Sequence, residues 1–208
     1  MAYPIVITVL ACYLLGNLNG AVCMSALLSH EDVRERGSGN AGLTNFARNY
    51  GGANSLLVML IDAGKAGVAC LLGGLLLKPY GLEREGMMLG AVSVSLGHDF
   101  PALLGFRGGK GILSGFACLL VIDWRSALIV LALFALAYLV SGYVSLGSVV
   151  GAVTYSACFG IFWREKPWVM AGGVFLGLLA LFMHRKNIVR LLRGEESKTN
   201  LFRKGKKP

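Results

Sequence analysis

Charged residues are scarce in this sequence. Of its 208 residues only 15% are Asp, Glu, Lys or Arg and 55% are hydrophobic, whereas a soluble domain usually carries about 25% charged residues. The first charge is Glu31, and long apolar runs recur as far as Met183. Such runs need a hydrocarbon solvent, because a helix that crosses a bilayer takes roughly 20 apolar residues. The composition excludes an ordinary soluble domain and predicts an all-α, polytopic integral membrane protein.

Several patterns of catalytic chemistry are also missing. No Ser stands in a G-x-S-x-G elbow, no His is followed five residues later by Asp, and no acidic cluster suggests a metal site. The cysteines form no C-x-x-C pair, and all lie in apolar runs, where we expect small buried core residues: Cys12, Cys23, Cys70, Cys118 and Cys158. We therefore expect no metal and no cofactor. A substrate of this protein would arrive already activated, and the protein would position it and stabilise developing charge.

Seven apolar segments predict the membrane-spanning helices. They are Tyr3–Leu28, Ala53–Leu77, Gly86–Leu104, Ile112–Ile122, Ser126–Val140, Gly147–Phe162 and Trp168–Met183. The fourth and fifth are shorter than a usual span, and only Asp123, Trp124 and Arg125 separate them. If the chain did not turn there, Gly111–Val140 would be one long helix and the total would be six.

Basic residues favour seven spans. Cytoplasmic segments of membrane proteins are enriched in Lys and Arg. With seven spans and the N-terminus outside, the basic residues of the first loop, of the loop before residue 112 and of the tail all lie inside. We therefore predict a cytoplasmic C-terminus and one membrane-embedded domain, residues 1–208. Its basic cytoplasmic tail, residues 184–208, ends in a run from Lys198 to Lys207 that is expected to face lipid headgroups.

Four polar, glycine-rich segments fall on the predicted cytoplasmic face. They are RGSGNAGLTNFAR (Arg36–Arg48), GHDFPALLGFRGGKG (Gly97–Gly111), GYVSLGS (Gly142–Ser148) and HRKNIVRLLRGEE (His184–Glu196). The first contains a G-x-G-x-x-G, but a dinucleotide-binding loop needs a strand and a βαβ unit around it. The second is not an ATP-binding G-x-x-x-x-G-K-[ST] loop, because Leu104 and Gly111 occupy the first-glycine and Ser/Thr positions.

These segments share the residue types that bind phosphate. Glycine lets backbone N–H groups approach an oxyanion, Arg and Lys supply positive charge, and Ser and Asn add neutral donors. The candidates are Gly37, Ser38, Gly39, Asn40, Gly42, Asn45, Arg48, Gly108, Gly109, Lys110, Gly111, Arg185, Asn187 and Arg190. We predict an anion site for a phosphate-bearing substrate, and no nucleic acid as a partner.

Other polar residues have structural explanations. Arg34 and Arg36 lie among acidic neighbours and are expected to form a solvated charge run. Asn17 and Asn19 are expected to make interhelical hydrogen bonds inside the first span.

Three residues keep two explanations each. Asp62 and Lys65 are three residues apart on one helical face, so they form either a structural ion pair or contacts to a substrate. His98 either caps the end of a span or belongs to the site.

The segments GSGNAGLTNFAR, GHDFPALLGFRGGKG and HRKNIVRLLRGEE resemble, in order and spacing, the three signature motifs of the bacterial acyl-phosphate-dependent glycerol-3-phosphate acyltransferases of the PlsY type. GYVSLGS fits between the second and third motifs, and the resemblance covers nearly the whole chain. It implies a seven-helix enzyme of the bacterial inner membrane with its site on the cytoplasmic face. The implied reaction moves an acyl chain from acyl-phosphate to the 1-hydroxyl of glycerol-3-phosphate, giving lysophosphatidic acid and inorganic phosphate. Membrane lipid and the enzyme that makes acyl-phosphate are the implied partners.

The resemblance also suggests roles for the candidate residues. Ser38, Gly39 and Asn40 would hold the phosphoryl oxygens of the acyl-phosphate. Arg48 and Lys110 would neutralise the two anionic substrates.

The remaining candidates would act on glycerol-3-phosphate. Asn45, His184 and Asn187 would orient it, and the base is either His184 or a substrate phosphate oxygen. Further donors and supports are expected from Gly108, Gly109, Ser145, Ser148, Arg185 and Glu196. Glu196 is expected to pair with Arg185 or Arg190.

Some positions depart from the family pattern. Ala41 and Leu43 replace a frequent Pro and a small Ala, Leu113 and Ser114 replace a small residue and Thr, and Ala66 replaces the Gly of D-x-x-K-G. The polar residues of the three motifs are all present. The alternative function is a transporter or channel for an organic phosphate, which would explain the charges and glycines equally well. Such proteins place their sites near the bilayer midplane on repeated, interrupted helices, and the sequence shows no convincing internal repeat.

Overall fold

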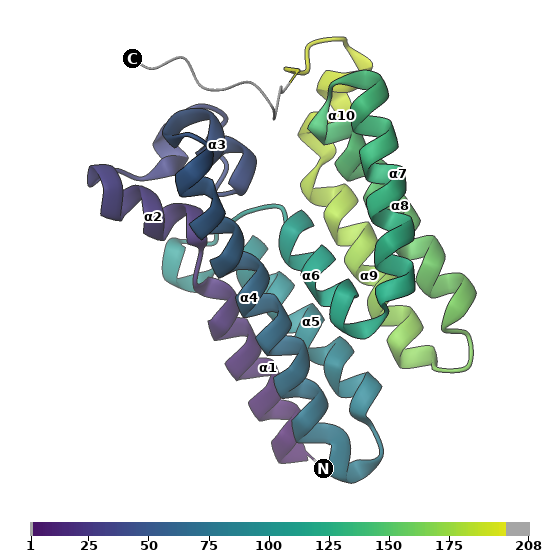
Figure 1. The fold of residues 1–208 in the computed structure, drawn as a ribbon. Helices are drawn as coiled ribbons and strands as arrows, with labels where there is room; N and C mark the ends of the chain where they lie inside the picture. The colour runs from purple at the N-terminus through teal and green to yellow at the C-terminus, as the bar shows by residue number, and fades with distance from the viewer. Residues whose placement is uncertain (1, 199–208) are drawn as a thin grey trace. The chain divides into compact units, whose positions relative to one another are not determined.

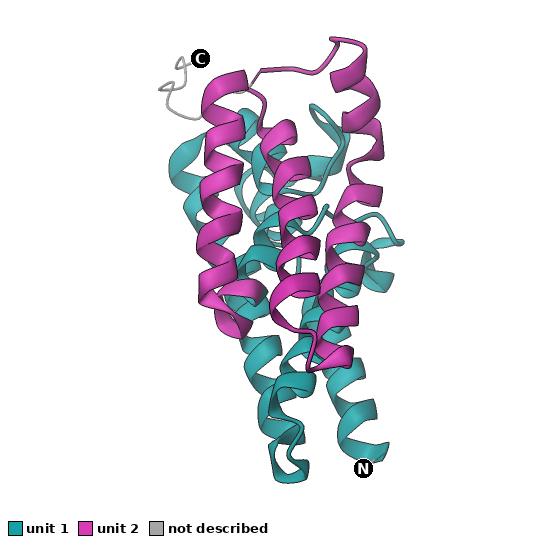
Figure 2. Cartoon of the chain, turned by 90° about the vertical axis from the view of Figure 1, so that its right-hand side faces the viewer, with its two compact units in different colours: residues 1–118, 204–208 teal, residues 119–203 magenta. Residues whose placement is uncertain are grey.

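A computed structural model describes residues 2–198, and the regular secondary structure of these residues is all helical. The chain forms two compact units, which within the described range are residues 2–118 and residues 119–198 (Figure 2). The predicted all-α class is therefore confirmed. The basic residues predicted to face lipid after Lys198 lie outside the described residues.

Unit 1 contains the first five helices and the start of the sixth. Its helices are α1 (Ala2–Asn17), α2 (Gly20–Ser29), α3 (Leu43–Tyr50), α4 (Gly52–Leu77) and α5 (Glu83–Asp99), with 3-10 turns η1 (Val33–Glu35), η2 (Lys78–Tyr80) and η3 (Ala102–Leu104). The long helices α1, α4 and α5 pack side by side (Figure 1). Glycines permit this close approach, since a Cβ on Gly73 would lie 2.1 Å from the carbonyl oxygen of Gly86.

The first predicted span is interrupted. Tyr3–Leu28 was expected to form one helix, but α1 ends at Asn17 and α2 begins at Gly20. Asn19 has extended backbone angles and its side chain accepts a hydrogen bond from Val22 N, so it acts as the N-cap of α2. The apolar composition predicted the span correctly, but the polar residues within it end one helix and start another.

Unit 2 contains α7 (Trp124–Ser141), α8 (Val144–Phe162), α9 (Pro167–Met183) and α10 (Arg185–Leu192), and α8 packs against both α7 and α9. The helix α6 (Ile112–Ile122) contains the boundary between the units. Asp123 ends it, because its side chain accepts hydrogen bonds from Arg125 N and Ser126 N and caps α7. The alternative of one long helix over Gly111–Val140 is therefore wrong, and the predicted turn at Asp123 is present.

The helices confirm a polytopic membrane protein. By length and composition five segments of the described chain can cross a membrane: Ala2–Ser29, Gly52–Tyr80, Glu83–Leu104, Trp124–Ser141 and Val144–Phe162. The pair α9 and α10, bent by 56°, would make a sixth, and α6 is a shorter apolar helix. The seven predicted segments all fall on helices, but α6 has only 11 residues. Among the cysteines, Cys23 is exposed rather than buried as expected.

Candidate functional site

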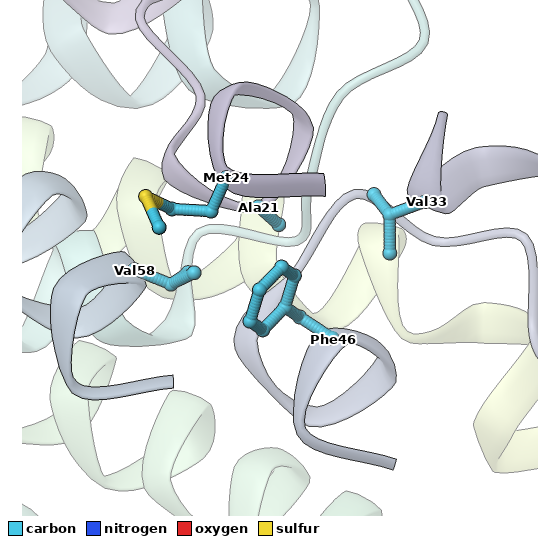
Figure 3. Packing of buried hydrophobic residues seen from close by; sticks show 5 residues of the cluster. All are labelled: Ala21, Met24, Val33, Phe46 and Val58. Carbon is cyan, nitrogen blue, oxygen red and sulfur yellow. The ribbon is translucent and has the colours of Figure 1, made fainter. Parts of the chain in front are cut away.

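The first predicted motif folds as a loop that leads into α3. A buried cluster of Ala21, Met24, Val33, Phe46 and Val58 holds the two ends of this loop against α2 and α4 (Figure 3). Burying one aromatic side chain of this kind stabilises a fold by about 1.5–3 kcal/mol. The loop between Val33 and Phe46 therefore starts and ends on a fixed apolar support.

Asn45 organises this loop from the inside. Its amide Nδ2 donates to the carbonyl oxygens of Val33, Arg36 and Asn40, each at 3.0 Å, and its Oδ1 accepts from Ser38 N at 3.0 Å. Because both protons and the oxygen are used within the loop, the expected contact of Asn45 with glycerol-3-phosphate is replaced by a structural role. A Cβ on Gly37 would lie 2.4 Å from Asn45 Oδ1, so glycine is required there, and its φ of +57° agrees.

Arg34, which lies outside the motifs, has a different environment from the one predicted. It was expected to belong to a solvated charge run, but its side chain is only 17% exposed. Its Nη1 donates to Leu104 O at 2.7 Å and to Arg107 O at 3.0 Å, while Nε and Nη2 hold the carboxylate of Asp32. The guanidinium thus ties the first loop to the second. Arg36 is exposed and pairs with Glu31, as expected of the charge run.

The second motif folds back onto the end of α5. Gly108 N donates to Asp99 O at 3.2 Å, and Gly109 N donates to His98 O at 3.0 Å. A Cβ on Gly108 would lie 2.0 Å from His98 O, so this turn requires a residue without a side chain. The N–H groups of both glycines are used inside the protein. Their role is therefore to let the turn form, not to bind an anion as expected.

Gly39 was also expected to help bind an anion, but its N–H donates to Arg36 O at 3.0 Å. The donors for an anion in unit 1 are therefore mainly side chains. Ser38 and Arg48 are exposed, and Lys110 is partly exposed in the turn next to Gly109. The N-terminus of α3, which begins at Leu43, carries no side-chain cap, so its first N–H groups and its dipole favour a negative ligand nearby.

Asp62 and Lys65 form a buried ion pair in α4. Lys65 Nζ lies 2.9 Å from Asp62 Oδ1 and 2.9 Å from His98 Nδ1. Both side chains are almost fully buried, at 1% and 3% exposed. The structural alternative for this pair is therefore the one supported, and His98 belongs to the same cluster instead of capping a helix in isolation.

The two asparagines of the first span also act on the loops. Asn19 Nδ2 donates to Ala41 O at 3.0 Å in the first loop, and Asn17 Oδ1 accepts from Leu103 N at 2.9 Å within the second motif. Asn17 Nδ2 donates to Tyr13 O within α1 at 2.8 Å. These bonds go to the two loop segments and to the asparagines' own helices, in place of the interhelical bonds that were expected.

Unit 2 places its candidates at the start of α8 and at the junction of α9 and α10. Ser145 and Ser148 lie on the first turns of α8, and both are buried. Ser148 Oγ donates to Val144 O at 3.0 Å. His184, the residue between the bent helices α9 and α10, is also buried, and its Nδ1 lies 2.8 Å from Ala180 O. A carbonyl can only accept, so Nδ1 carries a proton and Nε2 of the neutral ring is an acceptor.

Glu196 holds the segment after α10 against that helix. Its carboxylate accepts from Asn187 Nδ2 at 2.9 Å and from Arg190 Nε at 2.6 Å. Of the two partners expected for Glu196, Arg190 is therefore the one observed, while Arg185 lies over the ring of Phe182. Burial raises the pKa of Glu196, but the hydrogen bonds from Arg190 and Asn187 outweigh it and the pKa is lowered. Asn187 thus supports the C-terminal segment.

Ser145 lies close to the same carboxylate. Its hydroxyl helps to lower the pKa of Glu196. Ser145 Oγ is nevertheless buried, and it makes no well-directed hydrogen bond to any described residue. A buried hydroxyl that still needs a partner costs free energy. It is therefore a candidate donor for a bound molecule.

The described residues contain no group of three or more His, Cys, Asp or Glu side chains that could hold a metal ion. The motifs themselves present Ser, Arg and Lys side chains and the imidazole of His184.

The chain is similar to known proteins along most of its length. The sequence profile of the family described as glycerol-3-phosphate acyltransferase matches residues 6–194. A glycerol-3-phosphate acyltransferase of Finegoldia magna is 38% identical over 93% of this chain and 96% of its own length. One of Ralstonia pickettii is 34% identical over 94% of this chain and 95% of its own length.

Two crystal structures of PlsY (YgiH), an integral membrane glycerol 3-phosphate acyltransferase, have a similar fold. The glycerol 3-phosphate form has a TM-score of 0.84 and 28% identity, covering 96% of this chain and 99% of that one. The lysophosphatidic acid form has a TM-score of 0.78 and 26% identity, covering 94% and 95%. With a profile match along nearly its whole length, the chain belongs to the glycerol-3-phosphate acyltransferase family, in its PlsY branch.

Proposed function

We propose that the chain transfers an acyl group from acyl-phosphate to the 1-hydroxyl of glycerol-3-phosphate. Membership of its family makes it an acyltransferase that converts glycerol-3-phosphate to lysophosphatidic acid. Beyond this family activity, we propose the acyl donor, the hydroxyl that is acylated, the residues of the site and the membrane in which the enzyme lies. It places the enzyme in a bacterial inner membrane, with its site on the cytoplasmic face and its donor supplied by an enzyme that makes acyl-phosphate.

The donor assignment rests on the types of side chain that the motifs contain. Unit 1 holds Ser38 and Lys110 on two loops whose backbones are fixed by internal hydrogen bonds, and Arg48 on α3, which follows the first loop. The four cysteines other than Cys23 are buried, and the described residues contain no metal-binding cluster. An acyl-phosphate is a mixed anhydride that already carries a phosphate leaving group. It therefore needs a cradle for anions and a positioned alcohol, with no nucleophile on the enzyme.

In unit 1 we assign the phosphoryl group of the donor to Ser38, Asn40 and the N-terminus of α3. The uncapped first turn of α3 supplies N–H groups and a partial positive charge. Arg48 and Lys110 supply full charges for the two anionic substrates. Charge that develops on the departing phosphate is stabilised by these groups, a contribution of several kcal/mol in a partly dehydrated site.

In unit 2 we assign the acceptor alcohol to His184 and Ser145. The oxygen of the 1-hydroxyl attacks the acyl carbonyl carbon, the bond from that carbon to the phosphate oxygen breaks, and inorganic phosphate leaves with the electron pair. The hydroxyl proton goes either to Nε2 of His184 or to a phosphate oxygen of a substrate. The hydrogen bond from Nδ1 to Ala180 O favours the ring form in which Nε2 can accept it.

The test is phosphate release by purified protein given palmitoyl-phosphate and glycerol-3-phosphate. We expect release only when both are present, because direct transfer forms no acyl-enzyme. Lys110→Ala is expected to lose most of this activity. Lys78→Ala is the matched control, since Lys78 is 63% exposed, lies outside the motifs and pairs with Glu83 at 3.6 Å.

Two outcomes would contradict parts of the proposal. A burst of phosphate without glycerol-3-phosphate would indicate a covalent acyl-enzyme. Lysophosphatidic acid formed from acyl-CoA or acyl-carrier protein, but not from palmitoyl-phosphate, would refute the donor. If no donor gave product with folded protein, uptake of glycerol-3-phosphate into proteoliposomes would test the transporter alternative.

A further inference from the structure

We propose that Lys65 is a positioning residue for the loop that carries Lys110, and that it acts through the imidazole of His98. This inference rests on the proposed function, in which Lys110 binds substrate. Lys65 itself lies in the middle of α4 and is buried, so it touches the loop only through another residue.

The ammonium group of Lys65 is fully engaged. Besides Asp62 Oδ1 and His98 Nδ1, it donates to Gly16 O at 3.1 Å and to Leu18 O. The two carbonyls belong to the break between α1 and α2, where they lack partners within a helix. Asp62 Oδ1 in turn accepts from Gly20 N at 3.1 Å, at the start of α2. One buried ion pair thus fixes the end of α1, the start of α2 and a side chain of α5.

This arrangement determines which nitrogen of His98 carries a proton. An ammonium can only donate, so Nδ1 of His98 accepts from Lys65 and the neutral ring carries its proton on Nε2. The ring is therefore held in one orientation by a charged hydrogen bond.

The held ring forms the support of the second loop. A Cβ placed on Gly109 would lie 2.2 Å from His98 Nε2 and 3.0 Å from Cδ2 and Cε1. Gly109 therefore lies directly against the imidazole, and its N–H is bonded to the carbonyl oxygen of the same histidine. Lys110 is the next residue. A change in the ring's orientation alters this support of Gly109 and so affects the position of Lys110.

A buried lysine in a membrane-spanning helix is expensive, and such residues usually have a specific purpose. The ammonium shares its three protons among four acceptors, so its bond to the imidazole is one that the ion pair and the two carbonyls do not require. The fourth partner, His98, connects this pair to the substrate loop.

The test combines substitutions on both sides of the contact. Gly109→Ala places a methyl group against the fixed ring and is expected to reduce kcat/KM strongly. Adding His98→Ala removes the obstacle, and adding Lys65→Met lets the ring turn away. In each double variant we expect kcat/KM to recover by about tenfold over Gly109→Ala alone, a typical coupling between contacting residues. Gly115→Ala is the control, because a Cβ there meets nothing within 4 Å.

A merely structural role for Lys65 predicts a different result. The losses in kcat/KM of Lys65→Met and Gly109→Ala would then multiply in the double variant, and its unfolding temperature would fall. A double variant with no recovery of kcat/KM would overturn the proposal. If Lys65→Met does not fold, the ring form of His98 in the wild type decides, because the contact with Lys65 determines it.

A second readout does not depend on activity. The nitrogen-15 shifts of the His98 ring should show a proton on Nε2 in the wild type, and a proton on Nδ1 instead would also overturn the inference. If the wild type makes no lysophosphatidic acid but His98 shows the expected ring form, the proposed function fails while the support of Gly109 by the ring stands.

Discussion

The replacement of Arg34 by Lys tests whether the two substrate loops must be tied together. Lysine keeps the charge and can still reach Asp32, but a single ammonium cannot also reproduce the fork that binds both Leu104 O and Arg107 O. We therefore expect Arg34→Lys to lower kcat/KM while the protein still folds.

The expected size follows from the two lost hydrogen bonds. Hydrogen bonds from charged groups contribute about 1.5–3 kcal/mol each when well shielded. Arg34 is 17% exposed and its contact with Arg107 O is open to solvent, so we take about 1.5 kcal/mol for the bond to Leu104 O and about 0.5 kcal/mol for the bond to Arg107 O. A total of about 2 kcal/mol corresponds to roughly a 30-fold loss in kcat/KM if all of it holds the loop in the reactive position.

The assay is phosphate release with each substrate varied in turn, so that KM and kcat are separated, with the unfolding temperature measured on the same samples. Arg36→Lys is the matched control, because Arg36 is 49% exposed and pairs with Glu31 at the surface. Equal kcat/KM for the two variants would refute the reasoning. If the loss of kcat/KM in Arg34→Lys disappeared on cooling, the hydrogen bonds of Arg34 to the second loop would only stabilise the fold.

The stability that the pair of Arg34 and Asp32 contributes should also depend on pH. The hydrogen bond from Arg34 lowers the pKa of Asp32 below its usual 3.8, against the opposing effect of burial. A carboxylate with a lowered pKa stabilises the fold fully above its usual value, and this stabilisation is lost as the pH falls through the lowered value.

Three further predictions concern side chains that hold helix ends and loops in place. Glu196 has a pKa below its usual 4.5, so the difference in unfolding temperature between wild type and Glu196→Gln should be largest near pH 7 and disappear in acid; an increase in acid would contradict the lowered pKa. Asn45→Ala removes the internal hydrogen bonds of the first loop and should destabilise the protein by about 2 kcal/mol or more in denaturant unfolding; a smaller loss would argue against the role of Asn45. Asp123→Asn weakens the acceptor for Ser126 Oγ at 2.7 Å and Trp163 Nε1 at 3.1 Å, so Trp163 fluorescence should change while KM stays constant.

Much of the fold could be predicted because burial in lipid leaves a strong record in the sequence. Each apolar segment corresponds to a helix, and the end of α6 was signalled by Asp123, an acidic residue that caps the next helix. The break at Leu18 was not predictable from its own neighbours. It is held by the ammonium of Lys65, which is distant in sequence, and an Asn in an apolar run is equally compatible with a continuous helix.

The residue types of the site could be predicted, but the use of individual atoms could not. Gly108 and Gly109 are where a tight anion loop needs glycine, yet their N–H groups bond to carbonyl oxygens of α5. Asn45 has the donors of a substrate-binding residue, and each one is used inside the loop. A sequence motif records that a side chain is needed at a position. It does not record whether that side chain faces a ligand or its own backbone.

The contacts of Arg34 and Lys65, which lie outside the motifs, could not be predicted for a related physical reason. Arg34 and Lys65 act on main-chain carbonyl oxygens, those of Leu104 and Arg107 and those of Gly16 and Leu18. Every residue carries a carbonyl group, so the partner leaves no trace in the sequence. Such supports shape a loop without touching its ligand. Their replacement should therefore impair binding and turnover together, whereas replacing Lys110 should remove charge from the reaction itself and reduce kcat most.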